Sequence, residues 1–173
     1  MSRVAALLDR EGLVTRDTRG KILAVQWQDL IERWTQDYAL LKSNTARMYL
    51  EPRQFSDLLR KLRRTDRRYA VSGSLPAALK APVAASRLAV IFTPDLGRMA
   101  EDLRISPVEE VGNVYLLEPF DTVAFDRTWQ KDGVTYAALT QVAADLLTSP
   151  GRGPAEGRSL LDWMAKNEHA WRS

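Results

Sequence analysis

The densest group of chemistry-bearing side chains is a run of cations between residues 60 and 68. Six of these nine residues are lysine or arginine: Arg60, Lys61, Arg63, Arg64, Arg67 and Arg68. Clustered cations of this kind bind the phosphate backbone of nucleic acids. They would equally suit the solvated end of a helix, where positive charge complements the helix dipole. No aromatic residue is interleaved with them, so the run carries no signature of base stacking.

A second basic group surrounds a short hairpin near the N-terminus. Apolar spacing predicts a helix over residues 2–11, ended by Gly12, and strands over 13–15 and 22–25 around a turn that contains Gly20. This is the order of the recognition helix and wing in a winged helix-turn-helix domain. The cations that would face DNA from the helix and the hairpin are Arg3, Arg10, Arg16, Arg19 and Lys21. Two helices normally precede a recognition helix and none is seen before this one, so a wing that dimerises or docks a protein is the alternative.

The charge of the chain is unevenly distributed. Residues 1–72 contain 15 Lys and Arg against 9 Asp and Glu, and the rest contains 10 against 13, within a net charge of +3. A basic front half predicts contact with a polyanion. Hydrophobic residues make up 45% of the 173 positions, which is typical of a globular protein, and no apolar run reaches the ~20 residues that cross a bilayer. We expect a cytoplasmic protein without a signal peptide or membrane contact.

Several kinds of catalytic or metal site are excluded by residue type. The chain has no cysteine, so disulfides, thiolate metal sites and thiol catalysis are ruled out, and its single histidine, His169, is expected at the surface. Glu118, Asp121 and Asp126 have the types needed for a pair of acid and base carboxylates. Because no companion motif accompanies them, we interpret them as turn caps and ion-pair partners, and we expect no cofactor.

A strand, a Gly-Ser turn and a helix are predicted around residues 69–80. This order, followed by an apolar strand over 88–92, resembles the opening of nucleotidyltransferase-like folds, where Gly-Ser lets a phosphate approach a helix. Catalysis there needs two carboxylates, one residue apart on the following strand, to hold magnesium. The strand has none, and Asp95 stands alone after Pro94. A nucleotidyltransferase-type enzyme is therefore disfavoured.

The remaining patterns predict a mixed α/β (α+β) chain in two parts. Helices are expected over 27–41, 55–62, 75–80, 94–103, 140–147 (capped by Thr140) and 155–167. Strands are expected over 46–50, 69–71, 88–92, 114–117, 123–125 and 134–137, with a hairpin turn at 131–133. The pattern changes at Arg68, so we place the boundary between a winged-helix-like basic region, 1–68, and a mixed-sheet C-terminal domain, 69–173. The second region has enough apolar surface to fold by itself.

Four blocks of the sequence carry a resemblance to a known family. They are EGLVTRDTRGKILAVQWQDLIERW, YAVSGSLPAALKAP, NVYLLEPFDTVAFDRT and TQVAADLLTSPGRGPAEGRSLLDWM. Together they resemble the AbiEi-type antitoxins and transcriptional regulators of actinobacterial type IV toxin–antitoxin systems. The resemblance implies a winged helix that represses its own operon and a C-terminal domain that opposes a nucleotidyltransferase-like toxin.

We therefore expect a non-enzymatic regulator that binds operator DNA with its basic front half and a cognate toxin with its acidic rear. Formation of a homodimer is compatible with this expectation. The residues expected at the toxin surface are Asp121, Asp126, Arg127 and Arg152. The alternative is a protein-interaction module that neutralises an effector without binding DNA.

Overall fold

The computed structural model describes residues 3–172 and has a mixed α/β structure. Helix accounts for 42% and strand for 19% of it, which confirms the expected fold class at this coarse level. The chain forms two compact units, the first ending at Asp37 and the second beginning at Tyr38. None of the helices within residues 3–172 combines the length and the apolar character that a bilayer crossing requires.

The first unit contains a helix, a two-stranded hairpin and a second helix. These are α1 (Arg3–Arg10), β1 (Val14–Arg16), β2 (Ile22–Val25) and α2 (Trp27–Trp34). Gly12 lies in the turn that follows α1. Its φ of +72° is a left-handed backbone conformation, which favours glycine. Asp17 holds the hairpin tip because its Oδ1 accepts hydrogen bonds from the backbone N–H groups of Arg19 and Lys21, both at 2.9 Å. The predicted helix and hairpin are therefore present.

The single helix predicted over 27–41 is wrong, because the structure breaks it after Trp34. A second helix, α3 (Leu40–Ser43), starts from Ala39, whose backbone is extended (φ −140°, ψ 128°). Tyr38, between the two, donates a hydrogen bond of 2.6 Å from its hydroxyl to the carboxylate of Asp145, 107 residues further on. This tertiary contact fixes the break, and apolar spacing alone carries no sign of it.

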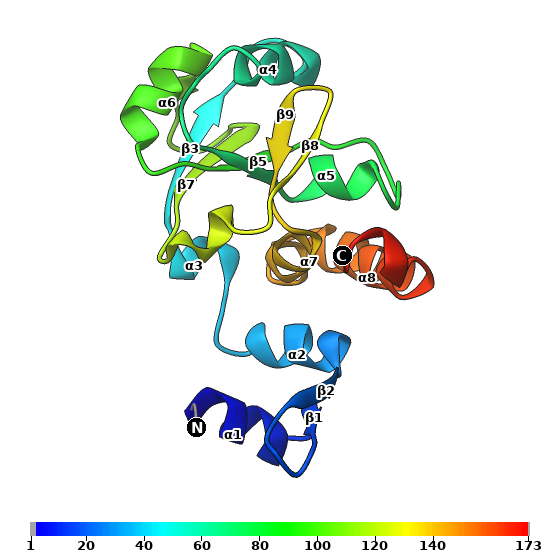
Figure 1. Cartoon of the computed structure of the whole chain (residues 1–173). Coiled ribbons are helices and arrows are strands. Elements are labelled where there is room, and N and C mark those ends of the chain that lie inside the picture. Colours follow the sequence, from blue (N-terminus) through cyan, green and yellow to red (C-terminus); the bar gives the residue numbers. More distant parts are fainter. Residues whose placement is uncertain (1–2, 173) are drawn as a thin grey trace. The chain divides into compact units, whose positions relative to one another are not determined.

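The second unit is built on a seven-stranded mixed sheet in the order β6-β3-β7-β5-β4-β9-β8 (Figure 1). Its strands are β3 (Thr45–Leu50), β4 (Ala70–Ser72), β5 (Ala89–Phe92), β6 (Ser106–Pro107), β7 (Val114–Glu118), β8 (Trp129–Lys131) and β9 (Val134–Tyr136). The pairs β5–β7 and β4–β9 are parallel, and the other pairs are antiparallel. All four residues of β5 are buried, which confirms the central strand expected from its unbroken apolar run.

Helices cover both faces of this sheet. They are α4 (Phe55–Leu62), α5 (Ser74–Ala78), α6 (Leu96–Leu103), α7 (Leu139–Leu147) and α8 (Gly153–Lys166), with 3-10 turns η1 (Thr122–Phe125) and η2 (Glu168–Ala170). Figure 1 shows α4 and α6 on one face and α5, α7 and α8 on the other. Leu58 and Leu62 of α4 join Met99 and Leu103 of α6 in one buried cluster with Ile91 of β5. The sheet face under α4 and α6 therefore forms a continuous hydrophobic core, and the ends of these two helices lie over it.

The expected boundary at residue 68 differs from the boundary between the compact units. β3 pairs with β7 at five positions, from Thr45–Glu118 to Tyr49–Val114, so the segment that contains β3 and α4 belongs to the second unit. The change of pattern at Arg68 marks the entry into β4, which lies inside this sheet. Long-range pairing, which the local pattern does not reveal, places the boundary about thirty residues earlier.

Two further local predictions are wrong. Residues 122–125 form a 3-10 turn instead of a strand, because Asp121 caps it by accepting a hydrogen bond from the Val123 N–H at 2.9 Å. The residue that precedes α7 is Ala138, so Thr140 lies inside the helix and does not cap it. The hairpin predicted at 131–133 is confirmed, with Asp132 at φ 51° and Gly133 at φ 73° in the turn between β8 and β9.

Candidate functional site

Four of the five cations predicted in the first unit are exposed. Arg3 and Arg10 lie on α1, and Arg19 and Lys21 lie at the hairpin tip. No ion pair within residues 3–172 involves any of the four. The backbone bonds to Asp17 hold the tip in shape without engaging the two tip cations. These four side chains are therefore available to a polyanion.

Arg16 differs from the other four. Its guanidinium binds the carboxylate of Asp9 on α1, its side chain is only 11% exposed, and its Nε is buried with no hydrogen-bond partner among the described residues. It joins the helix to the hairpin. We therefore remove it from the set of cations that would contact DNA.

The six cations of residues 60–68 do not form one surface. The Arg67 Nε binds Asp102 at 2.6 Å, and the Arg68 guanidinium lies 4.4 Å from the ring centre of Phe125. The stem of Arg63 passes the β8–β9 turn, where a Cβ on Gly133 would lie 3.5 Å from its Cγ. A different environment surrounds Arg60, Lys61 and Arg64, because all three line one cleft.

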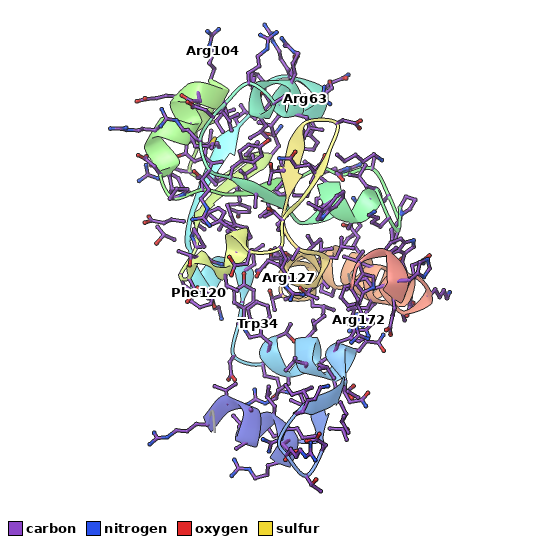
Figure 2. All side chains as sticks on the ribbon, viewed as in Figure 1. Trp34, Arg63, Arg104, Phe120, Arg127 and Arg172 are labelled. Carbon is purple, nitrogen blue, oxygen red and sulfur yellow. The ribbon has the colours of Figure 1, made fainter. Side chains whose placement is uncertain are left out.

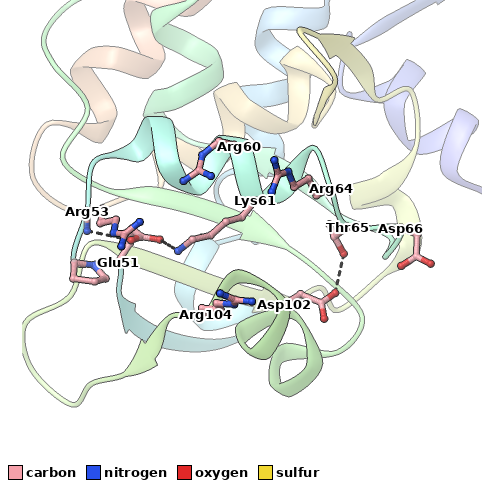
Figure 3. Close-up of a pocket in the computed structure, with 10 residues that line it drawn as sticks. Glu51, Arg53, Arg60, Lys61, Arg64, Thr65, Asp66, Asp102 and Arg104 are labelled. Carbon is pink, nitrogen blue, oxygen red and sulfur yellow. Dashed lines mark hydrogen bonds and ion pairs between the residues drawn. The ribbon is translucent and has the colours of Figure 1, made fainter.

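This cleft lies where the ends of α4 and α6 approach the turn after β3 (Figure 3). Its volume is about 600 Å³, and its lining is mostly charged. The lining residues are Glu51, Pro52, Arg53, Arg60, Lys61, Arg64, Thr65, Asp66, Asp102 and Arg104. Five of these are cations and three are carboxylates, so the cleft has an excess of positive charge.

Two of the three carboxylates are already neutralised by neighbouring groups. The carboxylate of Glu51, whose side chain is fully buried, binds the ammonium of Lys61 and also accepts a 3.1 Å hydrogen bond from the Arg53 N–H. Asp102 accepts hydrogen bonds from Arg67 and from the Thr65 hydroxyl, and these hold the pKa of Asp102 below its usual value. Both groups therefore add little repulsion toward an anion.

The other cations of the lining lie at the rim of the cleft. Arg64 and Arg104 take part in no ion pair within residues 3–172, and Arg53 and Arg60 both point to Asp57, which does not line the cleft. Arg104 ends α6 in the left-handed conformation (φ 48°, ψ 51°), a position where glycine or asparagine is usual. The rim thus offers guanidinium groups from three separate elements.

The residues predicted at a partner surface are brought together only in part. Asp121, Asp126 and Arg127 lie in the segment that follows β7, beside Phe120, which is 60% exposed, and Val123, which is 44% exposed. Figure 2 places Phe120 and Arg127 at the end of the second unit remote from Arg104. A hollow of about 400 Å³ adjoins this segment. Arg152 lies elsewhere, because it donates to the Ala85 carbonyl at 3.3 Å.

A buried polar network was not predicted from the sequence. Asp145 on α7 is 0% exposed and accepts hydrogen bonds from Tyr38, Ser72 and Gln141. Burial is the largest influence on this carboxyl and raises its pKa to about 7. In the sequence, the Ser72-Gly73-Ser74 motif indicates a turn that could approach a phosphate. In the structure, its first serine instead donates a hydrogen bond to Asp145 in this network. A buried aspartate inside the apolar run of α7 could not be told from an exposed one.

The Gly-Ser turn itself has a packing role. Gly73 lies at φ 71°, and a Cβ there would approach Val90 Cγ2 to 3.1 Å. The following helix, α5, has only five residues. No group of three or more histidine, cysteine or acidic side chains within residues 3–172 is arranged to hold a metal ion.

Comparison with known proteins provides no further guide. No family model, no curated protein and no solved structure matches the chain. Three features of the molecule are candidates for a binding function: the exposed cations of the first unit, the cationic cleft, and the segment around Phe120.

Proposed function

We propose that the chain is a non-enzymatic regulator that binds DNA through its first unit and a protein partner through its second. The partner we favour is a nucleotidyltransferase-like toxin, which makes the chain an antitoxin of the AbiEi kind. The sequence blocks that resemble that family support the choice of partner. Two surfaces support these roles: the exposed cations of the first unit and the segment around Phe120.

The observation that carries the DNA-binding proposal is the set of four exposed cations on α1 and the hairpin tip. A helix and a hairpin whose tips both carry cations can contact two stretches of phosphate backbone at once. Because no described carboxylate pairs with Arg3, Arg10, Arg19 or Lys21, a duplex would not have to break existing ion pairs.

The partner surface is the segment of residues 118–127. It combines exposed apolar side chains, Phe120 and Val123, with the exposed carboxylates of Asp121 and Asp126. An apolar centre with a charged rim is the usual composition of a protein interface. The acid groups would chiefly speed the encounter with a basic partner.

The test of DNA binding is a salt titration with a labelled duplex taken from upstream of the protein's own reading frame. Replacing Arg3, Arg10, Arg19 and Lys21 by glutamine should reduce the slope of log affinity against log salt by about three to four, since each phosphate contact contributes about 0.9. Arg16 is kept, because its loss would disturb the unit. The measurement is fluorescence anisotropy between 50 and 300 mM salt.

A matched control removes the same charge from the second unit. Arg87, Arg98, Lys131 and Arg158 are all exposed, and their replacement by glutamine should leave the slope within about one of the wild-type value. Equal slopes for the wild type and the first-unit variant would contradict the proposal. In that case the alternative, a protein-interaction module without DNA binding, is favoured.

A further inference from the structure

The cleft at the ends of α4 and α6 is not part of either surface used in the proposed function. Its ligand would be a small anion, because the space of about 600 Å³ lies within the range of small-molecule pockets. A DNA duplex, whose major groove alone is about 12 Å wide, is too broad to enter it. The cleft therefore belongs to a different kind of ligand from the hairpin of the first unit.

The charges of the lining indicate what kind of anion fits. At the base, Lys61 and the buried Glu51 neutralise each other, so this pair braces α4 against the turn after β3. At the rim, Arg53, Arg60, Arg64 and Arg104 surround the opening from three elements (Figure 3). Guanidinium groups bind the oxygens of carboxylates and phosphates in pairs, which favours an oxyanion over a halide ion, and several guanidinium groups around one opening favour the more highly charged phosphate.

The uncharged part of the lining indicates what is not recognised. Apart from Thr65, the one neutral residue in the lining is Pro52, and no aromatic side chain lines the cleft. A nucleobase or another ring would therefore find no stacking partner. Cations spread over three elements suit an anion with several linked phosphates better than a single phosphate, which one or two guanidinium groups would satisfy.

We propose that this cleft binds the oligophosphate group of a small molecule, held by Arg64 in the turn after α4 and by Arg104 at the end of α6, without recognition of any base. The site is independent of DNA binding by the first unit. It gives the chain a way to respond to phosphorylated metabolites while the first unit remains free.

Arg104 allows a test that does not endanger the fold. Because it adopts a left-handed conformation at the end of α6, replacement by asparagine removes the cation and suits the backbone better. Arg127 offers the matched control: it is also an exposed arginine in the left-handed region (φ 50°) but does not line the cleft. Lys61 is left intact, because its loss would leave Glu51 buried and unpaired.

The experiment is calorimetric titration of the full chain and its variants with inorganic tripolyphosphate, ATP, GTP and orthophosphate at one ionic strength. We expect tripolyphosphate, ATP and GTP to bind with similar affinity and orthophosphate at least about tenfold more weakly. Arg104→Asn, alone or with Arg64→Gln, should weaken tripolyphosphate binding by about tenfold or more, the usual loss for a hydrogen bond to a charged group. Arg127→Asn should leave it unchanged.

A second arm separates free oligophosphate from a nucleic-acid backbone. A labelled single-stranded oligonucleotide is titrated with and without tripolyphosphate. Oligonucleotide binding that tripolyphosphate does not displace and that Arg104→Asn leaves unchanged supports the proposal. The proposal is overturned if tripolyphosphate does not bind, if Arg127→Asn weakens tripolyphosphate binding as much as Arg104→Asn does, or if Arg104→Asn weakens binding of the oligonucleotide. The slope measured with duplex DNA for the first-unit variant is unaffected by any of these results, so the two proposals fail separately.

Discussion

Asp145 lies in an environment very different from the one that surrounds an aspartate in water. It is fully buried, and its carboxyl is surrounded by uncharged donors: the Tyr38 hydroxyl at 2.6 Å, the Gln141 amide at 2.8 Å and the Ser72 hydroxyl. Asn44 completes the network by donating to the Tyr38 oxygen at 3.1 Å. These contacts join the start of the second unit to α7 and β4. The network is therefore a structural joint whose strength depends on the charge of one carboxyl.

Stability is expected to fall as pH rises from about 4 to about 7 because of Asp145. Its pKa is raised from 3.8 to about 7, so the folded state holds the proton more tightly than the unfolded state and loses that advantage as the carboxyl ionises. Asp145→Asn mimics the protonated form and removes the dependence. Urea unfolding at pH 4.5, 6 and 8 should show wild type losing stability relative to this variant. Using the difference cancels Asp57 and Asp102, whose lowered pKa values act in the opposite direction in acid. A difference that stays constant with pH would contradict the expectation.

At the scale of elements, the sequence correctly predicted the strands and turns whose structure is determined by local residue spacing. The all-apolar run of β5 and the Asp132-Gly133 turn each have one structure that fits them, and both were found. The break after Trp34 was missed because its cause, the bond from Tyr38 to Asp145, joins residues 107 positions apart. The cleft was missed in the same way. The run at 60–68 was visible, but Arg53 and Arg104 reach it only through the packing of α4, α6 and β3.

The 3-10 turn η1 should be the element that contacts the partner protein. Val123→Ser removes an exposed apolar side chain from it and should weaken binding to the toxin about fivefold, which corresponds to about 1 kcal/mol for the lost apolar contact. Stability should change little, since Val123 is 44% exposed. The matched control is Val111→Ser, because Val111 is 81% exposed and lies outside this segment. Affinity is measured by interferometry with immobilised toxin. Equal losses for both variants would place the interface elsewhere.

At the scale of the whole molecule, the division into units separates the proposed DNA binding from the two proposed activities of the second unit. The four exposed cations of α1 and the hairpin belong to the first unit, while the segment around Phe120 and the cationic cleft belong to the second. The sequence-based boundary at residue 68 would cut through the second unit. It would remove β3 and α4, and with them the buried side chains of Tyr49, Leu58 and Leu62.

The fragment of residues 38–173 is therefore expected to fold and to bind the toxin, whereas 69–173 is not. The longer fragment keeps the whole seven-stranded sheet and the Tyr38–Asp145 bond. The shorter one exposes the edge of β7 that pairs with β3 at five positions and loses three large core side chains. At about 1.5–3 kcal/mol each, these side chains alone approach the total stability of a typical domain.

Urea unfolding followed by tryptophan fluorescence tests the difference between the two fragments. Residues 38–173 should unfold in one cooperative transition, protect cells against the toxin, and bind duplex DNA much more weakly than the full chain. Residues 69–173 should show a broad transition without protection. A sharp transition at the same midpoint in both fragments would mean that β3 and α4 are dispensable. Protection by the full chain but not by a folded 38–173 fragment would move the toxin surface into the first unit, because only that unit has been removed.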